Sequence, residues 1–271
     1  MRDLAEELDS HGFAQVAGPF RTTNNANEFS TALVDECRRR NGLSPLSIVG
    51  EFVVPPLDAG ETRDFQALHF DFGVPLDPKV VLDVARYTAL YVPAEVGEVR
   101  AATRLVPLVA LLGQRTWPPP RELIRRLISY GRTHGAWDDD RGYVEGSLAR
   151  LVDGATAYRS PFLPSVKIEP EFLCGLEFDS IIAEVAFLER QGLRVDDVEI
   201  SVYLQPGELL VFDNLVMAHG RRGTRRPGQL HQWMFGDSLH PEDLITLRDR
   251  FLTAFHGRQS EESIASTMIR S

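Results

Sequence analysis

The chain has 271 residues with a net charge of −10, and 43% of its residues are hydrophobic while 25% are charged. This balance is that of a folded protein, and the negative charge argues against a general binder of nucleic acid or anionic membranes. Two cysteines, Cys37 and Cys174, exclude a disulfide scaffold and a cysteine-rich zinc module. No apolar run approaches the roughly 18 residues of a membrane span, and the acidic start does not resemble a signal peptide. We therefore expect a cytoplasmic protein.

The first part of the chain predicts one helix followed by three strands. Residues 29–41 place apolar side chains at helical spacing and end before a glycine, which predicts a helix. Residues 47–54 are rich in β-branched side chains and end at two prolines, which predicts a strand. Residues 86–92 and 103–112 predict two further strands, and Gly97 indicates a turn between them.

The second part predicts an insertion over residues 113–198, in which a glycine- and proline-rich stretch forms a long loop or lid. Helices are predicted at residues 121–130 and 178–190 within the insertion. Three strands and a closing helix follow it, at residues 199–204, 208–213, 229–235 and 241–256. Because crossover helices do not alternate with the strands, we expect a single, mainly β domain over residues 1–271 with flanking helices and stacked antiparallel sheets.

A histidine and an aspartate lie two residues apart in the segment Ala67-Leu68-His69-Phe70-Asp71-Phe72-Gly73. Side chains alternate along a strand, so His69 and Asp71 are predicted to project from one face. An imidazole beside a carboxylate supplies half of an open metal site. The same pair can instead be a simple hydrogen-bonded couple at the end of a strand.

A second and more specific motif runs from Leu204 to Arg221. Gln205-Pro206-Gly207 predicts a type II turn, an apolar strand follows it, and Asp213-Asn214 breaks this strand before a short second one that carries His219. We expect Asp213 and Asn214 to hold that turn rather than to react. Two histidines and one carboxylate on a metal leave three positions open, which is typical of non-heme Fe(II) oxygenases.

The order of these motifs resembles the Fe(II)/2-oxoglutarate dioxygenases of the taurine dioxygenase and clavaminate synthase-like group. The resemblance covers roughly residues 45–236 and is strongest from Pro206 to Arg221. It implies a double-stranded β-helix (jelly roll), with His69, Asp71 and His219 as ligands of Fe(II). It also implies 2-oxoglutarate and O₂ as co-substrates, and hydroxylation of an unactivated C–H bond with release of succinate and CO₂.

The residues that bind the co-substrate are less well defined. A hydroxyl residue of the family helps to hold its carboxylate, and the run Ala101-Ala102-Thr103 makes Thr103 the candidate here. The family also places an arginine about 10 to 15 residues after the distal histidine, where this chain has none. Arg225, Arg226 and His231 are the predicted substitutes. The two arginines belong to a cluster of four, Arg221, Arg222, Arg225 and Arg226, which can equally be a solvated turn.

Two other functions remain compatible with the sequence. One is a cupin-like metalloenzyme that does not use 2-oxoglutarate, and the missing strand arginine favours it. The other is a jelly-roll binding module without catalytic activity. The resemblance favours a small polar substrate, such as an amino acid or a biosynthetic intermediate of secondary metabolism. Neither nucleic acid nor a membrane is expected as a partner, and the oligomeric state stays open.

Overall fold

The computed structural model describes residues 1–18, 20–53, 65–69, 74–75, 82–97, 99, 101–107, 110, 143–144, 180–190, 194–214, 216–223 and 230–239. Within these residues the chain forms mostly strands, and every strand pairing is antiparallel. The expectation of mainly β structure with antiparallel sheets and a few helices is therefore confirmed. None of the described helices is long and apolar enough to cross a membrane.

The larger sheet has five strands and is built from both ends of the chain. In spatial order its strands are β1 (Phe13–Ala17), β9 (Glu208–Asp213), β5 (Leu82–Tyr91), β11 (His231–Leu239) and β2 (Ser47–Val53). Strand β5 lies in the middle and pairs with β9 on one side and with β11 on the other. Its residues from position 85 onwards are buried, as expected for a central strand covered on both faces.

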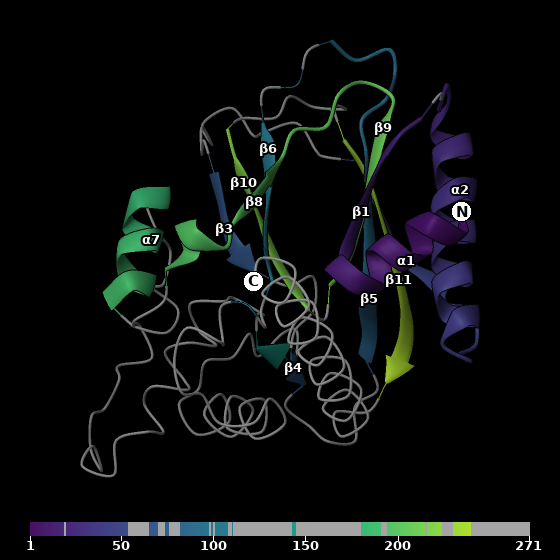
Figure 1. Cartoon of the computed structure of the whole chain (residues 1–271), viewed down its shortest axis with the longest axis horizontal. Coiled ribbons are helices and arrows are strands. Elements are labelled where there is room, and N and C mark those ends of the chain that lie inside the picture. The colour runs from purple at the N-terminus through teal and green to yellow at the C-terminus, as the bar shows by residue number, and fades with distance from the viewer. Residues whose placement is uncertain are drawn as a thin grey trace, which may run out of the picture.

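The smaller sheet has four strands and carries both histidines of the sequence motifs. Its spatial order is β3 (Phe65–His69), β10 (Met217–Arg222), β6 (Ala102–Pro107) and β8 (Ile200–Val202). Two short strands, β4 (Val74–Pro75) and β7 (Tyr143–Val144), pair separately. The two larger sheets lie side by side in Figure 1, and contact between Phe212 of β9 and His219 of β10 shows that their inner faces meet.

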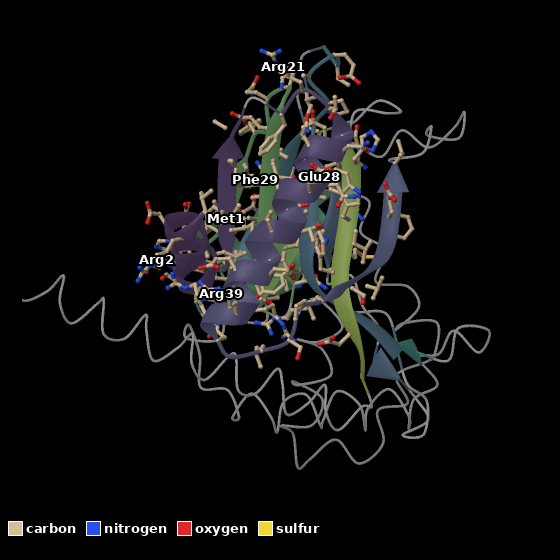
Figure 2. The ribbon with its side chains drawn as sticks, turned by 90° about the vertical axis from the view of Figure 1, so that its right-hand side faces the viewer. Met1, Arg2, Arg21, Glu28, Phe29 and Arg39 are labelled. Atoms are coloured by element: carbon tan, nitrogen blue, oxygen red, sulfur yellow. The ribbon has the colours of Figure 1, made fainter. Side chains whose placement is uncertain are left out.

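Helices cover the outer faces of the two sheets, α1 (Arg2–His11) and α2 (Thr23–Arg40) on the larger one and α7 (Ile181–Arg190) on the smaller one (Figure 1). In Figure 2, α2 runs across the larger sheet from near Arg21 to beyond Arg39. A single 3₁₀ turn at Val195–Asp197 leads from the α7 region into β8.

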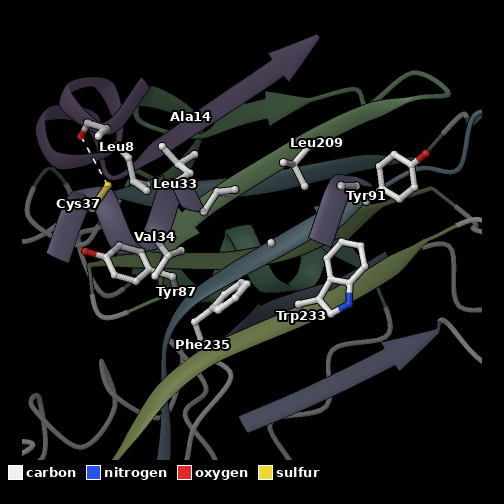
Figure 3. Close-up of a cluster of buried hydrophobic side chains, with 14 of the residues drawn as sticks. Leu8, Ala14, Leu33, Val34, Cys37, Tyr87, Tyr91, Leu209, Trp233 and Phe235 are labelled. Carbon is white, nitrogen blue, oxygen red and sulfur yellow. Dashed lines mark hydrogen bonds between the residues drawn. The ribbon is translucent and has the colours of Figure 1, made fainter. Parts of the chain in front are cut away.

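A cluster of buried hydrophobic residues forms a core between α1, α2 and the outer face of the larger sheet (Figure 3). Leu8 and Leu33 enter it from the two helices, and Trp233 and Phe235 enter it from β11. Cys37 is fully buried there, and its thiol lies 3.8 Å from the Ala5 carbonyl oxygen. It packs as a small apolar residue, as predicted.

Strand and helix predictions agree with the structure in position more than in length. Strand β9 has the predicted bounds, and β2 differs by one residue. Helix α2 begins at Thr23 rather than at residue 29, because the Thr22 hydroxyl accepts the Asn25 backbone N–H and caps it there. Strand β6 is described over Ala102–Pro107, and residues 108–109 and 111–112 of the predicted strand lie outside the described residues. The predicted helices at 121–130 and 241–256, Cys174 and most of the predicted lid lie outside the described residues.

Candidate metal centre

The two motif histidines, separated by about 150 residues in the sequence, lie directly opposite each other in the smaller sheet. His69 is the last residue of β3, and His219 is its register partner on β10. Their ring centroids are 4.3 Å apart, with an angle of 49° between the planes. His219 is buried, with 6% of its surface exposed, while His69 is half-buried. One imidazole therefore lies inside the fold and the other lies nearer its surface.

Hydrogen bonds around His69 define which ring nitrogen is available to a ligand. Its Nδ1 lies 2.9 Å from the Ala67 carbonyl oxygen, which can only accept a hydrogen bond, so Nδ1 carries the proton. The lone pair is then on Nε2, where the Gln66 side-chain amide lies 3.3 Å away as a donor. A backbone carbonyl that fixes the tautomer in this way is typical of metal-binding histidines.

His219 is held by the turn that precedes its strand. The Asn214 side-chain amide donates to the Ala85 carbonyl oxygen at 3.0 Å. The Asn214 backbone N–H donates to the Arg86 backbone carbonyl oxygen at 2.8 Å. Asp213 accepts a buried pair of hydrogen bonds from Arg86. The prediction that Asp213 and Asn214 support the turn is confirmed.

The charge of Arg86 is maintained by its partner. Burial disfavours the charged guanidinium, but the charge and hydrogen bonds of Asp213 outweigh this cost and raise the pKa of Arg86. Burial also raises the pKa of the neighbouring Tyr87 hydroxyl. The turn before His219 is therefore anchored by a buried contact between the Arg86 guanidinium and the Asp213 carboxylate.

Asp71, the predicted carboxylate ligand, lies outside the described residues. Within the part of the chain that the structure describes, no group of three potential metal ligands is found. The structure thus brings together two of the three predicted ligands. The third predicted ligand, Asp71, follows His69 by two residues in the sequence.

Thr103 lies on the same face of the smaller sheet as His219. Strand β6 pairs with β10 without interruption, so that Leu105 faces His219 and Thr103 faces Arg221. Residues two apart on a strand project to the same side, which places Arg221 on the face of His219 as well. Thr103 is 1% exposed. A hydroxyl and a guanidinium therefore share this face, two residues from the buried imidazole.

The other described arginine of the cluster points away. Arg222 follows Arg221, so it projects to the outer face, where its Nη2 donates to Glu199 at 3.2 Å. Arg225 and Arg226 lie outside the described residues. Within the described part of the cluster, Arg221 alone belongs to the face that carries His219.

Strand β11 presents His231 to the helices rather than to the other sheet. Its ring stacks on Trp233, with centroids 6.1 Å apart, and Trp233 belongs to the core under α1 and α2. By alternation, the residues of β11 that face the smaller sheet are Gln232 and Met234. The structure therefore does not bring His231 to the face of His69 and His219, and these two inward positions of β11 are uncharged.

Two features of the site have no clear signal in the sequence. Gln66 reaches His69 from three residues upstream, across a β-bulge that interrupts the pairing of β3 with β10. Helix α7 contributes Glu184, whose carboxylate hydrogen-bonds to β3 directly before His69. A glutamate on an otherwise apolar helix face is the one pattern that could indicate the second contact.

No family model and no curated protein matches this chain. Among solved structures it is similar to PvcB from Pseudomonas aeruginosa, at 14% identity and a TM-score of 0.45 over 89% of this chain and 82% of that chain. It is also similar to a structure of PvcB described as an Fe, alpha-ketoglutarate dependent oxygenase from an isonitrile synthetic pathway, at 15% identity and a TM-score of 0.47 over 89% of this chain and 82% of that chain. The non-heme iron oxygenase OrfP in complex with Fe is similar at 12% identity and a TM-score of 0.44, over 88% of this chain and 78% of OrfP.

A putative alpha-ketoglutarate-dependent taurine dioxygenase from Burkholderia xenovorans is similar at 13% identity, with a TM-score of 0.39 over 89% of this chain and 86% of that chain. These solved structures are of the group that the sequence motifs resemble.

Proposed function

We propose that this chain is a non-heme Fe(II)/2-oxoglutarate-dependent oxygenase with a jelly-roll fold, in which His69, Asp71 and His219 hold Fe(II). The observation that carries the proposal is the direct cross-strand pairing of His69 and His219, with ring centroids 4.3 Å apart. Two distant motifs that each lack a complete site thereby meet at one point. Asp71 follows His69 by two residues, the spacing that puts both side chains on one face of an extended segment.

The donor set suits ferrous iron. Two imidazoles and one carboxylate occupy one face of a metal and leave three positions for other ligands. Ala67 holds His69 in the tautomer that offers Nε2. Imidazole nitrogens and a carboxylate are also the ligands of other divalent metals, so the donor set supports this class of centre, and titration with metal ions identifies the ion.

The residues around the histidines would orient the co-substrate and exclude water. When bound, iron with 2-oxoglutarate and O₂ supplies the oxidation of a C–H bond, which the protein itself cannot perform. Phe212 packs against His219 at 4.7 Å between ring centroids, and Leu105 lies opposite it, so the inner side of the centre is apolar. Thr103 and Arg221 would bind the distal carboxylate of 2-oxoglutarate by a hydroxyl and a forked guanidinium. The substrate we propose is a small polar molecule.

Anaerobic titration with Fe(II) and 2-oxoglutarate tests the proposal. We expect a metal-to-ligand charge-transfer band in the visible, and we expect it to be lost in His69→Ala and His219→Ala. His11→Ala is the matched control, because His11 ends α1 on the far side of the larger sheet. Iron binding without the band would refute the 2-oxoglutarate part, and absence of iron binding would refute the metal centre.

The assignment of Arg221 has its own test. Arg221→Ala is expected to weaken 2-oxoglutarate binding by about 10- to 100-fold, the range of one charge-assisted contact. Arg222→Ala removes a neighbouring guanidinium that points to Glu199, so it should leave the affinity unchanged. Equal losses in both variants would show that the cluster acts only through its general positive charge.

A cupin-like metalloenzyme that does not use 2-oxoglutarate is the second candidate. The observation that favours it is the pair of inward positions on β11, which carry Gln232 and Met234 rather than a cation. Under this alternative, iron binds to the same histidines and the addition of 2-oxoglutarate changes neither the spectrum nor the affinity. A binding module without catalysis would bind no iron at all.

A further inference from the structure

A buried cluster of charges lies on the outer face of the smaller sheet, on the opposite side from the histidines. Arg104 of β6 is 0% exposed, and its Nη1 donates to Glu184 of α7 at 2.6 Å. Its Nε donates to Glu199 at 2.9 Å. Burial alone would lower the pKa of Arg104, but the two carboxylates outweigh it and raise the pKa. The Arg104 guanidinium is therefore both charged and fully buried.

Stability alone does not explain such a cluster. Removing charges from water costs several kcal/mol per ion, and apolar residues of similar volume are often equally or more stabilising. A buried carboxylate that also contacts the backbone can instead define a local geometry. Glu184 is such a group, because only 1% of its surface is exposed and each of its two oxygens accepts a different donor.

The second oxygen of Glu184 binds β3 at the residue before His69. Oε1 of Glu184 accepts the Leu68 backbone N–H at 2.6 Å, while Oε2 accepts Arg104. Among the described strands β3 lies at one edge of its sheet, and its register with β10 passes from His69 to Gln66 across a bulge. The Leu68 N–H therefore lies where the regular ladder is interrupted and needs a separate acceptor.

Strand β10 lies between β3 and β6, and it carries Gly220 where it packs against the bulge of β3. Gly220 pairs with Arg104 and directly follows His219. A Cβ at Gly220 would lie 2.6 Å from the Gln66 carbonyl oxygen and 3.2 Å from that of Ala67. The bulged backbone of β3 thus packs closely against β10 one residue from His219. Arg104 and Glu184 connect β6, β3 and α7 around this point.

We propose that Glu184 and Arg104 act as a positioning clamp, which holds the bulge of β3 so that His69 stays opposite His219. The effect of the clamp on the position of β3 does not depend on a bound metal. Its effect on metal affinity rests on the proposed function. Glu184 touches neither histidine, so it is a positioning residue. When Glu184 no longer accepts the Leu68 N–H, the segment of β3 between Gln66 and His69 can shift along β10 or move away from it.

The clamp is tested by a pair of isosteric substitutions around the same arginine. Glu184→Gln offers one acceptor to two donors, so its amide NH₂ must face either Arg104 or the Leu68 N–H. Glu199→Gln also replaces a buried carboxylate on Arg104 and serves as the control. Within the described residues, the side-chain hydrogen bonds of Glu199 go to Arg104, Ser201 and Arg222, and not to β3. Both proteins are checked for an intact fold by circular dichroism before the measurements.

Two readouts are compared. Amide hydrogen exchange at Leu68 and His69 is expected to accelerate about 10- to 100-fold in Glu184→Gln, the effect of losing a charge-assisted hydrogen bond. It should change less than about threefold in Glu199→Gln. Co(II) is used as a spectroscopic metal probe, and its affinity is expected to fall about 10- to 100-fold in Glu184→Gln only, as for other residues that orient ligands.

Unchanged exchange at Leu68 in both Glu184→Gln and Glu184→Asp would overturn the clamp, as would equal acceleration in Glu184→Gln and Glu199→Gln. If Glu184→Gln does not fold, the charge-conserving Glu184→Asp replaces it, and its shorter side chain is expected to keep Arg104 and accelerate exchange at Leu68. Wild-type protein that binds no Co(II) but shows the expected exchange pattern would refute the proposed function and retain the clamp. Accelerated exchange with unchanged Co(II) affinity would overturn the role of the clamp at the metal.

Discussion

The buried ion pair between Arg86 and Asp213 gives a quantitative test of how the turn before His219 is held. Its side chains are 4% and 9% exposed, and Arg86 Nη2 lies 2.9 Å from Asp213 Oδ2, with Nε at 3.1 Å from the same oxygen. Replacing Asp213 by Ala leaves the guanidinium buried without this partner. Breaking a buried pair from one side costs about 3–5 kcal/mol, so we expect Asp213→Ala to lose that much unfolding free energy.

The double variant Arg86→Met/Asp213→Leu separates charge from packing. Removing both charges and filling their volume with apolar atoms is often neutral or stabilising, so the double variant should recover most of the loss. Urea unfolding measures both effects. At an m-value of about 2 kcal/mol/M, the single substitution should lower the midpoint by about 1.5–2.5 M. The double variant should lie close to the wild-type protein.

The exposed pair of Arg39 and Glu36 on α2 is the control for this measurement. Glu36→Ala removes an ion pair that is open to solvent, where screening by water leaves little net stabilisation, so no measurable change in the midpoint is expected. A loss below about 1 kcal/mol in Asp213→Ala would refute the reasoning. A double variant as unstable as the single one would show that packing, and not an unpaired charge, determines the cost.

Three further predictions concern the core, a close backbone contact and a helix cap. Burial raises the pKa of Cys37 from 9.0 to about 12, so the unfolded state loses this proton first, and the unfolding free energy should fall as the pH rises from 9 towards 12. Urea midpoints between pH 8 and 11 should show a smaller fall in Cys37→Ala, and an identical fall would contradict the assignment. Gly220→Ala brings a Cβ to 2.6 Å from a backbone carbonyl oxygen and should cost about 1–3 kcal/mol. Gly50→Ala meets only the ends of two side chains, so its cost in the same urea assay should be smaller. Thr22→Ala should lower the stability by about 1 kcal/mol, and Thr22→Ser should restore it.

Much of the strand pattern can be predicted from the sequence because its signals are local. Pro206 and Gly207 predict a type II turn, and the structure has φ of 86° at Gly207 with the Glu208 N–H donating to Gln205. The bounds of β9 follow from this turn at one end and from Asp213-Asn214 at the other. In each case the residues that define the element lie within a few positions of it.

The first turns of α2 and the whole of β1 do not follow from local sequence, since tertiary contacts decide them. The segment from Thr23 to Glu28 contains three asparagines, which have a low helix propensity, yet it is helical because Thr22 caps it and Ala26 is buried in the core. Strand β1 alternates only weakly and is a strand because it pairs with β9. Long-range pairing of this kind leaves little trace in a short window of sequence.

Local sequence rules likewise predict some of the candidate site residues and not others. Alternation along a strand is a local rule, and together with the two motifs it is enough to select His69 and His219 from the seven histidines of the chain. The same rule cannot orient His231, because the face that β11 presents depends on its partners β5 and β2 and not on its own sequence.

The register between β3 and β10 is the step that no local rule supplies. His69 faces His219 only because a bulge removes one residue of β3 from the ladder, and regular pairing from Gln66 and Arg221 would place Leu68 opposite His219 instead. A one-residue slip reverses the face of every side chain on a strand, so the bulge decides whether the two imidazoles can share a ligand at all. The residues that accommodate it, Gly220 and Glu184, come from another strand and from a helix. The proposed metal centre therefore depends as much on the opposite face of its sheet as on the ligands themselves.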